Sequence, residues 1–171
     1  MRKQTKLVAV LSTAALLAIG ASMTSFAATG WAEEDGTWVY YNRDGERATD
    51  QWKKSGNNWY WLDSDGEMAI DQLIEDGDNY YYVDINGVMA ANQWVAIDNE
   101  DAGEDDEPDH YWYYFQANGK ALTNGDNDKV SLKTVNGKKY AFDDEGKMLY
   151  VWVSEDNAER VDNTDGDGFK E

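Results

Sequence analysis

A single spacing of 21 residues organises most of this chain. The positions that follow one another at that distance hold Trp31, Trp52, Leu73 and Trp94. Glycines repeat with the same step at Gly45, Gly66 and Gly87, and later ones follow at Gly119 and Gly146. A fixed period of this length is the signature of a repeat protein, in which each unit buries its apolar face against its neighbours. We therefore expect a linear series of similar units.

Each repeat contains an aromatic strand followed by a polar turn. In the second repeat Trp59–Leu62 precede Asp63–Gly66, and Glu67–Ala69 then have the pattern of a second short strand. Turns that end in Asp-Gly or Asn-Gly favour β-hairpins, because Gly and Asn tolerate a positive φ. We predict an all-β fold, a solenoid of tandem β-hairpins, in which the glycine at the position of Gly66 closes each hairpin.

Alternation along the aromatic strands separates two faces. One face accepts aliphatic residues and is expected to form the shared core; it holds Val39 and Tyr41, Tyr60 and Leu62, Tyr81 and Val83, Tyr113 and Phe115, and Tyr140 and Phe142. The second face holds Trp38 and Tyr40, Trp59 and Trp61, Tyr80 and Tyr82, Trp112 and Tyr114, and, in the fifth repeat, Lys139 and Ala141. A position that accepts Lys is partly wet, so we predict that the second face is displayed to a ligand. The alternative is that all these rings pack inside the solenoid.

The repeats also set the domain boundaries. Five repeats are expected within residues 28–152, near 30–50, 51–71, 72–92, 93–124 and 125–150. An acidic insertion at 98–109 lengthens the fourth repeat and is expected to be a mobile surface loop. Residues 151–171 have the character of an incomplete sixth repeat or an acidic tail, and we interpret the chain as a fragment of a longer protein.

Residues 1–27 have the features of a secretory signal peptide. Basic residues precede an apolar run from Leu7 to Ile19, and small residues surround an expected cleavage site after Ala27. The apolar run is short for a membrane span. A secreted chain with no membrane attachment after cleavage is therefore expected. The chain has no cysteine, so packing or metal, rather than disulfides, must stabilise the exported fold.

The charge balance narrows the class of partner. The chain has 15 Lys and Arg against 34 Asp and Glu, a formal net charge of -19. Nucleic acids and bare anionic wall polymers are poor partners for such a surface, because affinity for phosphates depends on Lys and Arg. Cationic groups and neutral glycans remain as candidate ligands, and no cofactor is expected.

Two stretches in the first two repeats have a specific motif. They are Gly30-Trp31, Trp38-Val39-Tyr40-Tyr41 and Gly45, and then Trp52, Trp59-Tyr60-Trp61-Leu62, Gly66 and Met68. They closely resemble the cell-wall-binding, or choline-binding, repeat family, and the resemblance covers roughly Gly30 to Trp152. It implies a solenoid of hairpins in which the leading Trp, a strand aromatic of the same repeat and an aromatic of the next repeat form a small cage. It also implies attachment to choline-bearing teichoic acids, while related repeats bind glucans.

The resemblance implies four candidate cages in this chain. One joins Trp31 and Trp38 to Trp59, and a second joins Trp52 and Trp59 to Tyr80. A third, around Tyr80 and Trp112, has Leu73 where the leading Trp should be. A fourth, around Trp94 and Trp112, has Lys139 as its neighbour and is expected to fail as a cation site. The predicted ligand-binding residues are Trp31, Trp38, Trp52, Trp59, Tyr80, Trp94 and Trp112.

We predict a secreted, non-catalytic module that is attached to the cell wall or cell surface. Choline-decorated teichoic acid is the first expected ligand, and a neutral glucan is the alternative; a structural segment of a larger surface protein has the same sequence features. An enzyme has no support, since the one histidine, His110, lies beside the acidic insertion and there is no cysteine. Asn163–Gly168 faintly resemble a calcium loop, but the chain ends before the acidic twelfth ligand of such a loop.

Overall fold

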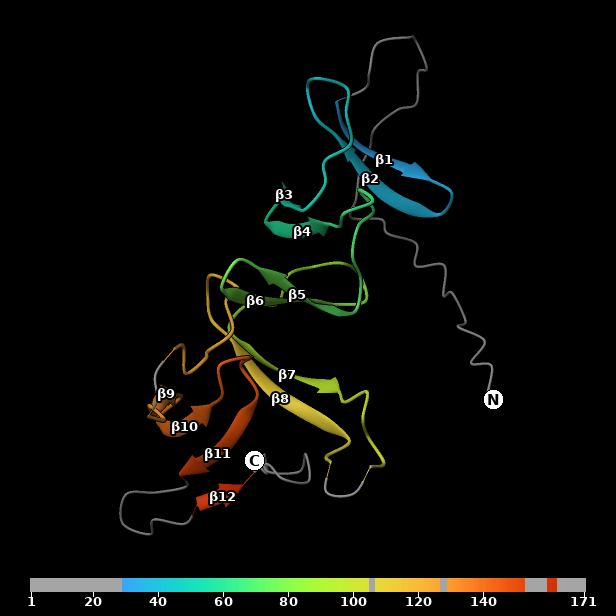
Figure 1. Cartoon of the computed structure of the whole chain (residues 1–171). Helices are drawn as coiled ribbons and strands as arrows, with labels where there is room; N and C mark the ends of the chain where they lie inside the picture. Colours follow the sequence, from blue (N-terminus) through green and yellow to red (C-terminus); the bar gives the residue numbers. More distant parts are fainter. Residues whose placement is uncertain (1–28, 105–106, 127–128, 153–159, 163–171) are drawn as a thin grey trace. The chain divides into compact units, whose positions relative to one another are not determined.

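The computed structural model describes residues 29–104, 107–126, 129–152 and 160–162 (Figure 1). Within these ranges the regular secondary structure is entirely β, with no helix, so the all-β prediction of successive antiparallel hairpins is confirmed. The strands are β1 Gly30–Glu34, β2 Thr37–Tyr41, β3 Gln51–Ser55, β4 Asn58–Leu62, β5 Gln72–Asp76, β6 Asn79–Val83, β7 Gln93–Asp98, β8 His110–Phe115, β9 Lys133–Val135, β10 Lys138–Phe142, β11 Met148–Trp152 and β12 Arg160–Asp162.

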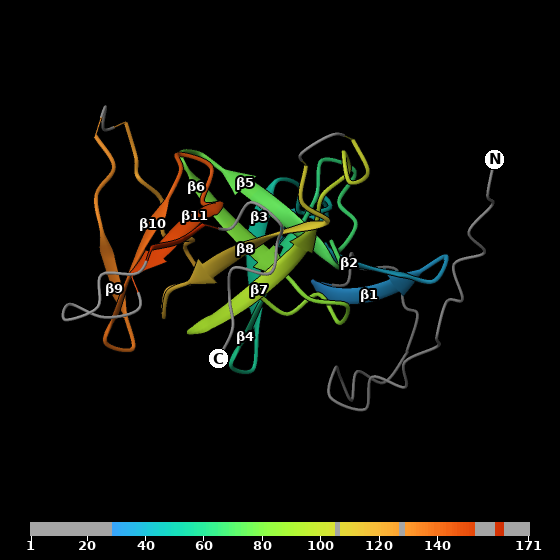
Figure 2. The same ribbon diagram turned by 90° about the horizontal axis from the view of Figure 1, so that it is seen from below.

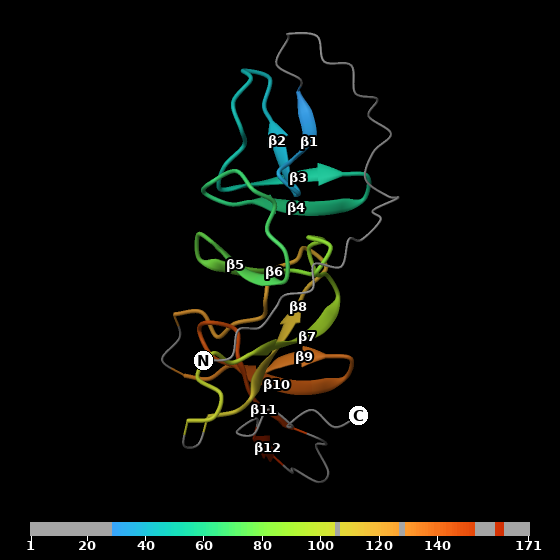
Figure 3. The same cartoon turned by 90° about the vertical axis from the view of Figure 1, so that its right-hand side faces the viewer.

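The described residues divide into two compact bodies. The N-terminal body contains the hairpins β1–β2 and β3–β4, blue and teal in Figure 1, together with the segment Ile85–Val88. The C-terminal body contains the hairpins β5–β6 and β7–β8 and a four-stranded sheet in the order β12-β11-β10-β9 (Figures 2 and 3). In that sheet β12 adds antiparallel pairs to β11, although residues 153–159 and 163–171 lie outside the described ranges.

The leading strand of a repeat and its aromatic strand are joined by a turn that the sequence analysis did not predict. Asp35–Gly36, with φ of 52° and 84°, and Asn136–Gly137, with φ of 47° and 81°, have the two positive φ values of type I′ turns. Gly56 and Gly77 have a positive φ at the first central position, as in type II′ turns. The segment that leads into each repeat is therefore itself a strand. The prediction that the turn at the position of Gly66 closes each hairpin is confirmed for β10 and β11, which meet at the turn of Gly146, and is wrong for the hairpins that the leading strands form.

The predicted turn glycines close a second turn after each aromatic strand. The Gly45 N–H donates to the Asn42 carbonyl at 3.0 Å, and Gly66 donates to Asp63 at the same distance. After this turn a single residue pairs with the aromatic strand in an antiparallel β-bridge, as Arg47 does with Tyr41. Among the described residues, β11 alone extends this pairing into a strand. It pairs with β10 from Phe142 opposite Met148 to Lys139 opposite Trp152.

Each second turn also joins its repeat to the one before it. In the N-terminal body the Met68 N–H donates to the Trp38 carbonyl at 2.8 Å, and in the C-terminal body Ala121 donates to Tyr80 at 2.8 Å. The turn glycine then approaches the preceding repeat closely: a Cβ on Gly119 would lie 2.5 Å from the Met89 Sδ. Glycine is needed here both for this approach and for its φ of 84°.

The predicted core face is largely confirmed. Its second position is fully buried in four repeats, at Leu62, Val83, Phe115 and Phe142. Its first position is buried at Tyr60, Tyr113 and Tyr140, whereas Tyr81 is half-buried. In the first repeat the order reverses, because Val39 precedes a half-buried Tyr41. A period-2 pattern therefore located the shared core correctly.

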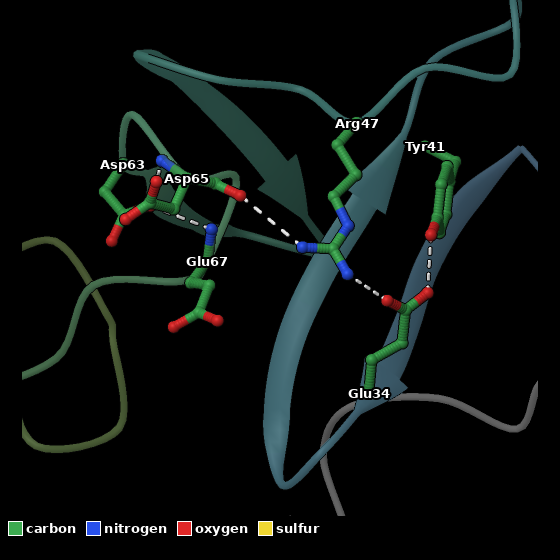
Figure 4. A network of polar contacts seen from close by, with 6 residues as sticks. All are labelled: Glu34, Tyr41, Arg47, Asp63, Asp65 and Glu67. Atoms are coloured by element: carbon green, nitrogen blue, oxygen red, sulfur yellow. Dashed lines mark hydrogen bonds and ion pairs between the residues drawn. The ribbon is translucent and has the colours of Figure 1, made fainter.

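A polar network links the first hairpin to the second turn of the next repeat (Figure 4). The Tyr41 hydroxyl donates to Glu34 Oε1 at 2.5 Å, and the Arg47 guanidinium pairs with Glu34 Oε2 and donates to the Asp65 carbonyl at 3.4 Å. Asp63 Oδ1 in turn accepts the backbone N–H of Asp65 at 2.9 Å. Two hydrogen bonds lower the pKa of Glu34: the one from Tyr41 has the larger effect, and the one from Arg47 has the next largest.

The acidic insertion connects β7 to β8. Its base is closed by Asn99, whose N–H donates to the Asp109 carbonyl and whose Nδ2 donates to the Pro108 carbonyl, both at 2.9 Å. Glu107 Oε2 accepts a hydrogen bond of 2.8 Å from the Tyr111 hydroxyl. The insertion therefore lengthens one hairpin and leaves its strand pairing intact. Its mobility stays a prediction, and the signal peptide and the calcium-like residues 163–168 lie outside the described residues.

Candidate functional site

Cross-strand pairing arranges the second face of each hairpin into two pairs of side chains. Directly opposed residues of an antiparallel pair share a face. The inner pair joins the leading residue of the repeat to the second aromatic of the strand: Trp31 with Tyr40, Trp52 with Trp61, Leu73 with Tyr82, and Trp94 with Tyr114. The outer pair joins the first aromatic to a residue of the leading strand: Trp38 with Glu33, Trp59 with Lys54, Tyr80 with Glu75, and Trp112 with Ala96.

The two pairs differ in their exposure to solvent. Trp59 of the outer set is 40% exposed, and Trp38, Tyr80 and Trp112 are half-buried. In the inner set Trp31 and Trp61 are each only 8% exposed. The prediction that the whole second face is displayed is therefore wrong for Trp61, and also for Ala141, which is fully buried. The other inner rings are half-buried, like most of the outer ones, and the most exposed ring of this face is Trp59 at its outer end. The half-buried inner rings are Tyr40, Trp52, Tyr82, Trp94 and Tyr114.

The inner tryptophans pack against the following hairpin. Trp31 contacts Tyr40 of its own hairpin edge-to-face at a centroid distance of 5.3 Å and Tyr60 of the next at 5.4 Å. Trp94 lies 4.7 Å from Tyr140 and 5.9 Å from Phe142. These rings stack one repeat on the next, so a leading Trp is a core residue as well as a candidate wall of a ligand site.

The first candidate cage lies wholly in the N-terminal body. Trp31 and Trp38 share one core cluster, in which Trp38 is the more exposed ring. The Trp38 carbonyl is held by the Met68 N–H of the next repeat. Trp59 belongs to that repeat and lies on β4. The Trp31 Nε1 is buried and has no hydrogen-bond partner, so an indole donor is left unsatisfied inside this cluster.

Of the other candidate cages, the third and the fourth consist of residues of the C-terminal body, and the second includes residues of both bodies. The second joins Trp52 and Trp59 to Tyr80 of the C-terminal body and stays a prediction. In the third, Tyr80 and Leu73 pack on the cluster around Phe115. In the fourth, Trp94 and Trp112 pack together on the cluster of Val135, Tyr140, Phe142 and Met148. Trp112 also has an edge-to-face contact of 5.7 Å with His110.

Ammonium groups of the chain already lie over ring faces. Lys53 Nζ is 4.7 Å from the Tyr40 centroid and donates to Asn42 Oδ1 at 2.9 Å. Lys54 Nζ is 5.7 Å from the Trp59 centroid. In the C-terminal body Lys147 Nζ is 4.8 Å from Tyr111. These distances lie within the range of cation–π attraction, so the exposed rings have the geometry to accept cations.

Negative charges lie around Tyr80 in the C-terminal body. Burial, and after it the charge of Glu75, raise the pKa of Tyr80, and the carboxylates of Asp143, Asp144 and Glu145 act in the same direction. Across the described ranges, His, Asp and Glu side chains form no group of three or more that could hold a metal ion. None of the described segments forms a helix with the length and apolar character needed to cross a bilayer.

Comparison with known proteins identifies the repeat. The family model described as a choline-binding repeat matches residues 28–69 and 48–94, and a cell wall binding repeat model matches residues 111–121. The choline-binding domain of Spr1274 from Streptococcus pneumoniae is 32% identical to this chain, and the match covers 56% of this chain and 95% of that one. The chain belongs to the choline-binding repeat family.

Three solved structures differ in their sequence identity and TM-score to this choline-binding repeat chain. The TM-score against the Spr1274 domain is 0.41. Choline-binding protein F from Streptococcus pneumoniae is 27% identical with a TM-score of 0.40, and the match covers 71% of this chain and 42% of that protein. Truncated alternansucrase from Leuconostoc mesenteroides is 22% identical with a TM-score of 0.51, over 70% of this chain and 10% of the enzyme, which shows a shared fold alone. A comparison with curated proteins found no match.

Sequence reasoning missed the lysines of these choline-binding repeats. Lys53 reaches back from β3 to Tyr40 on β2, a contact that depends on how successive hairpins stack. Lys54 follows it in the sequence and faces the other side of the same strand, where it opposes Trp59. Strand alternation could have placed Lys54 on the ring face, had the leading segment been recognised as a strand.

Proposed function

We propose that this chain is an exported, non-catalytic module that binds choline-bearing wall teichoic acid through the aromatic rings of its repeats. The supporting observation is Trp59, which is a large apolar ring left 40% exposed, with a cation already near its face. The half-buried rings of Trp38, Tyr80 and Trp112 hold the same position in the other hairpins. The predicted walls Trp31, Trp52 and Trp94 lie on the leading strands of their repeats.

The chemistry of the rings favours a quaternary ammonium. Such a cation is attracted to the negative face of an aromatic ring by about 0.5–1 kcal/mol at an exposed contact and about 2 kcal/mol when desolvated. Two or three rings therefore give a few kcal/mol, and about 4.1 kcal/mol corresponds to a Kd of 1 mM. Each site is weak by itself. Several sites on one repetitive polymer raise the overall affinity through effective concentration, which is a physical reason for tandem repeats.

The charge of the chain supports the same ligand. A formal net charge of -19 attracts cationic head groups and repels polymers that present only phosphate. A choline-bearing polymer offers its ammonium groups outermost, so its cations meet the rings first. A neutral glucan would gain stacking on the same rings but nothing from this charge.

Retention on purified cell walls tests the proposal. Wild-type protein should bind choline-bearing walls and be released by free choline, whereas Trp38→Ala and Trp59→Ala should bind less. Ile85→Ala, which truncates another exposed apolar side chain at 56% exposure, is the matched control and should bind normally. Release by soluble glucan instead of choline would show that the ligand of these rings is a neutral carbohydrate. Measurable hydrolysis of the walls would contradict the non-catalytic assignment.

A further inference from the structure

The four outer rings each oppose a different side chain on the neighbouring strand. Trp38 opposes Glu33, Trp59 opposes Lys54, Tyr80 opposes Glu75 and Trp112 opposes Ala96. All four of these partners are exposed. Directly opposed residues share one face of the hairpin, with Cβ atoms about 4.5–5.5 Å apart. Whatever approaches an outer ring from solvent therefore also meets its cross-strand partner.

The charge of this partner changes from repeat to repeat. It is negative in the first and third repeats, positive in the second and absent in the fourth. Lys54 Nζ lies 5.7 Å from the Trp59 centroid, so this ring, the most exposed of the four, has an ammonium of the chain close to it. On the third hairpin Glu75 lies directly opposite Tyr80, and its charge, after burial, raises the pKa of that phenol. The same carboxylate would favour a bound cation.

We propose that the cross-strand partner of the outer ring sets the cation affinity of each repeat: Glu33 and Glu75 strengthen binding at Trp38 and Tyr80, and Lys54 weakens it at Trp59. This proposal rests on the proposed function, because it concerns a cationic ligand at the same rings. Lys54 competes with the ligand for the face of the Trp59 ring, because its ammonium already lies over that face and repels the positive charge of the ligand. The repeats therefore form a graded set of sites instead of identical copies.

The expected size of the effect follows from the exposure of these groups. Two unit charges interact by about 1 kcal/mol at 4 Å in bulk water, which corresponds to about fivefold in affinity, and salt weakens exposed pairs further. Replacing Lys54 with Glu removes a repulsion and adds an attraction. We expect an increase of about three- to tenfold in choline affinity at Trp59 at low salt.

The test uses two ligands of the same shape. Choline carries the charge, and its carbon isostere 3,3-dimethylbutan-1-ol does not. Titrations of the whole chain are followed by NMR at the indole N–H resonances of Trp38 and Trp59, assigned with Trp38→Phe and Trp59→Phe. Lys54→Glu should raise choline affinity, Glu33→Lys should lower it at Trp38, and affinity for the neutral isostere should change little in either variant. Lys138→Glu, the same change of charge at an exposed position of β10, is the control for net charge.

The outcomes separate this proposal from the function on which it rests. If the wild type binds choline but Lys54→Glu behaves like Lys138→Glu, or if the isostere gains as much as choline, the role of the partner is refuted while choline binding stands. If the wild type binds choline at neither Trp38 nor Trp59, the proposed function itself fails. Lys54→Met keeps the length of the side chain without the charge and should give an intermediate gain, and circular dichroism of each variant checks the fold.

Discussion

Trp31 lies directly opposite Tyr40 in the first hairpin, and their ring centroids are 5.3 Å apart at an interplanar angle of 83°. The same indole contacts Tyr60 of the next hairpin at 5.4 Å. Trp31 is thus buried between two repeats, whereas Trp59, at the outer end of the same kind of face, is 40% exposed. Inner rings stabilise the stack and outer rings remain for a ligand, so stability and binding should respond to different substitutions.

The first prediction separates these two roles. Trp31→Ala should lower the free energy of unfolding by about 3–5 kcal/mol, because it removes a buried indole and leaves a cavity. Trp59→Ala should cost less than about 1.5 kcal/mol, because much of its ring is already in water. Urea denaturation followed by circular dichroism measures both. Equal losses for the two variants would contradict the division into inner and outer rings.

The second prediction concerns the close approach of a turn glycine to the preceding repeat. Gly119→Ala should destabilise the protein by about 1–2 kcal/mol for its positive φ and by about 1 kcal/mol more for the contact with Met89, whose flexible end can move aside. Gly36 has the same φ of 84° but nothing within 4 Å of an added Cβ, so Gly36→Ala should show the first cost alone. Thermal denaturation compares the two, and Met89→Ala in the Gly119→Ala background should recover part of the difference. Identical losses at both glycines would show that the contact is unimportant.

The third prediction follows from the network around Glu34. Hydrogen bonds from Tyr41 and Arg47 lower the folded-state pKa of Glu34 below its ordinary 4.5. Its contribution to stability is therefore fully present above about pH 4.5 and is lost as the pH falls through the lower folded-state value. Glu34→Gln should be less stable than the wild type near pH 7, and the difference should shrink below pH 4.5. Urea denaturation of the wild type and of Glu34→Gln at each pH measures the difference, and a difference that stays constant down to pH 3 would contradict the prediction.

The fourth prediction applies at alkaline pH. Burial raises the pKa of Tyr113 from 10.0 to about 12. A raised tyrosine pKa means that the folded state holds the proton more tightly, so stability is complete below pH 10 and falls as the pH rises toward 12. Tyr113→Phe should reduce this alkaline loss, and ultraviolet absorbance of phenolate should show one fewer late-titrating tyrosine. An unchanged absorbance titration would place the late-titrating group elsewhere.

The repeat period was sufficient to predict the shared core. Strand alternation places Val39, Leu62 and Phe142 on the core face of their strands, and all three are fully buried. The hairpin turns were misplaced because Asp63–Gly66 has strong turn residues of its own. Asp35–Gly36 and Asn136–Gly137 have equally strong ones, and recognising them would have made the leading segments strands.

The ring contacts between repeats depend on stacking and not on local pattern. The pairing of Trp31 with Tyr60, and the position of Lys53 over Tyr40, arise only when one hairpin lies on the next. Strand alternation assigns Trp61 to the same face as Trp59, yet one is buried and the other exposed. Strand alternation gives the face on which a ring lies, but it does not tell how far other residues of the folded chain cover that ring.

Calorimetric titration of the wild type and of Trp59→Ala, with choline beside a panel of neutral glucans, tests the central claim most directly. The account predicts choline binding with millimolar dissociation constants, weaker binding by Trp59→Ala, and no displacement of choline by the glucans. Heat of binding from a glucan, with none from choline, would contradict it.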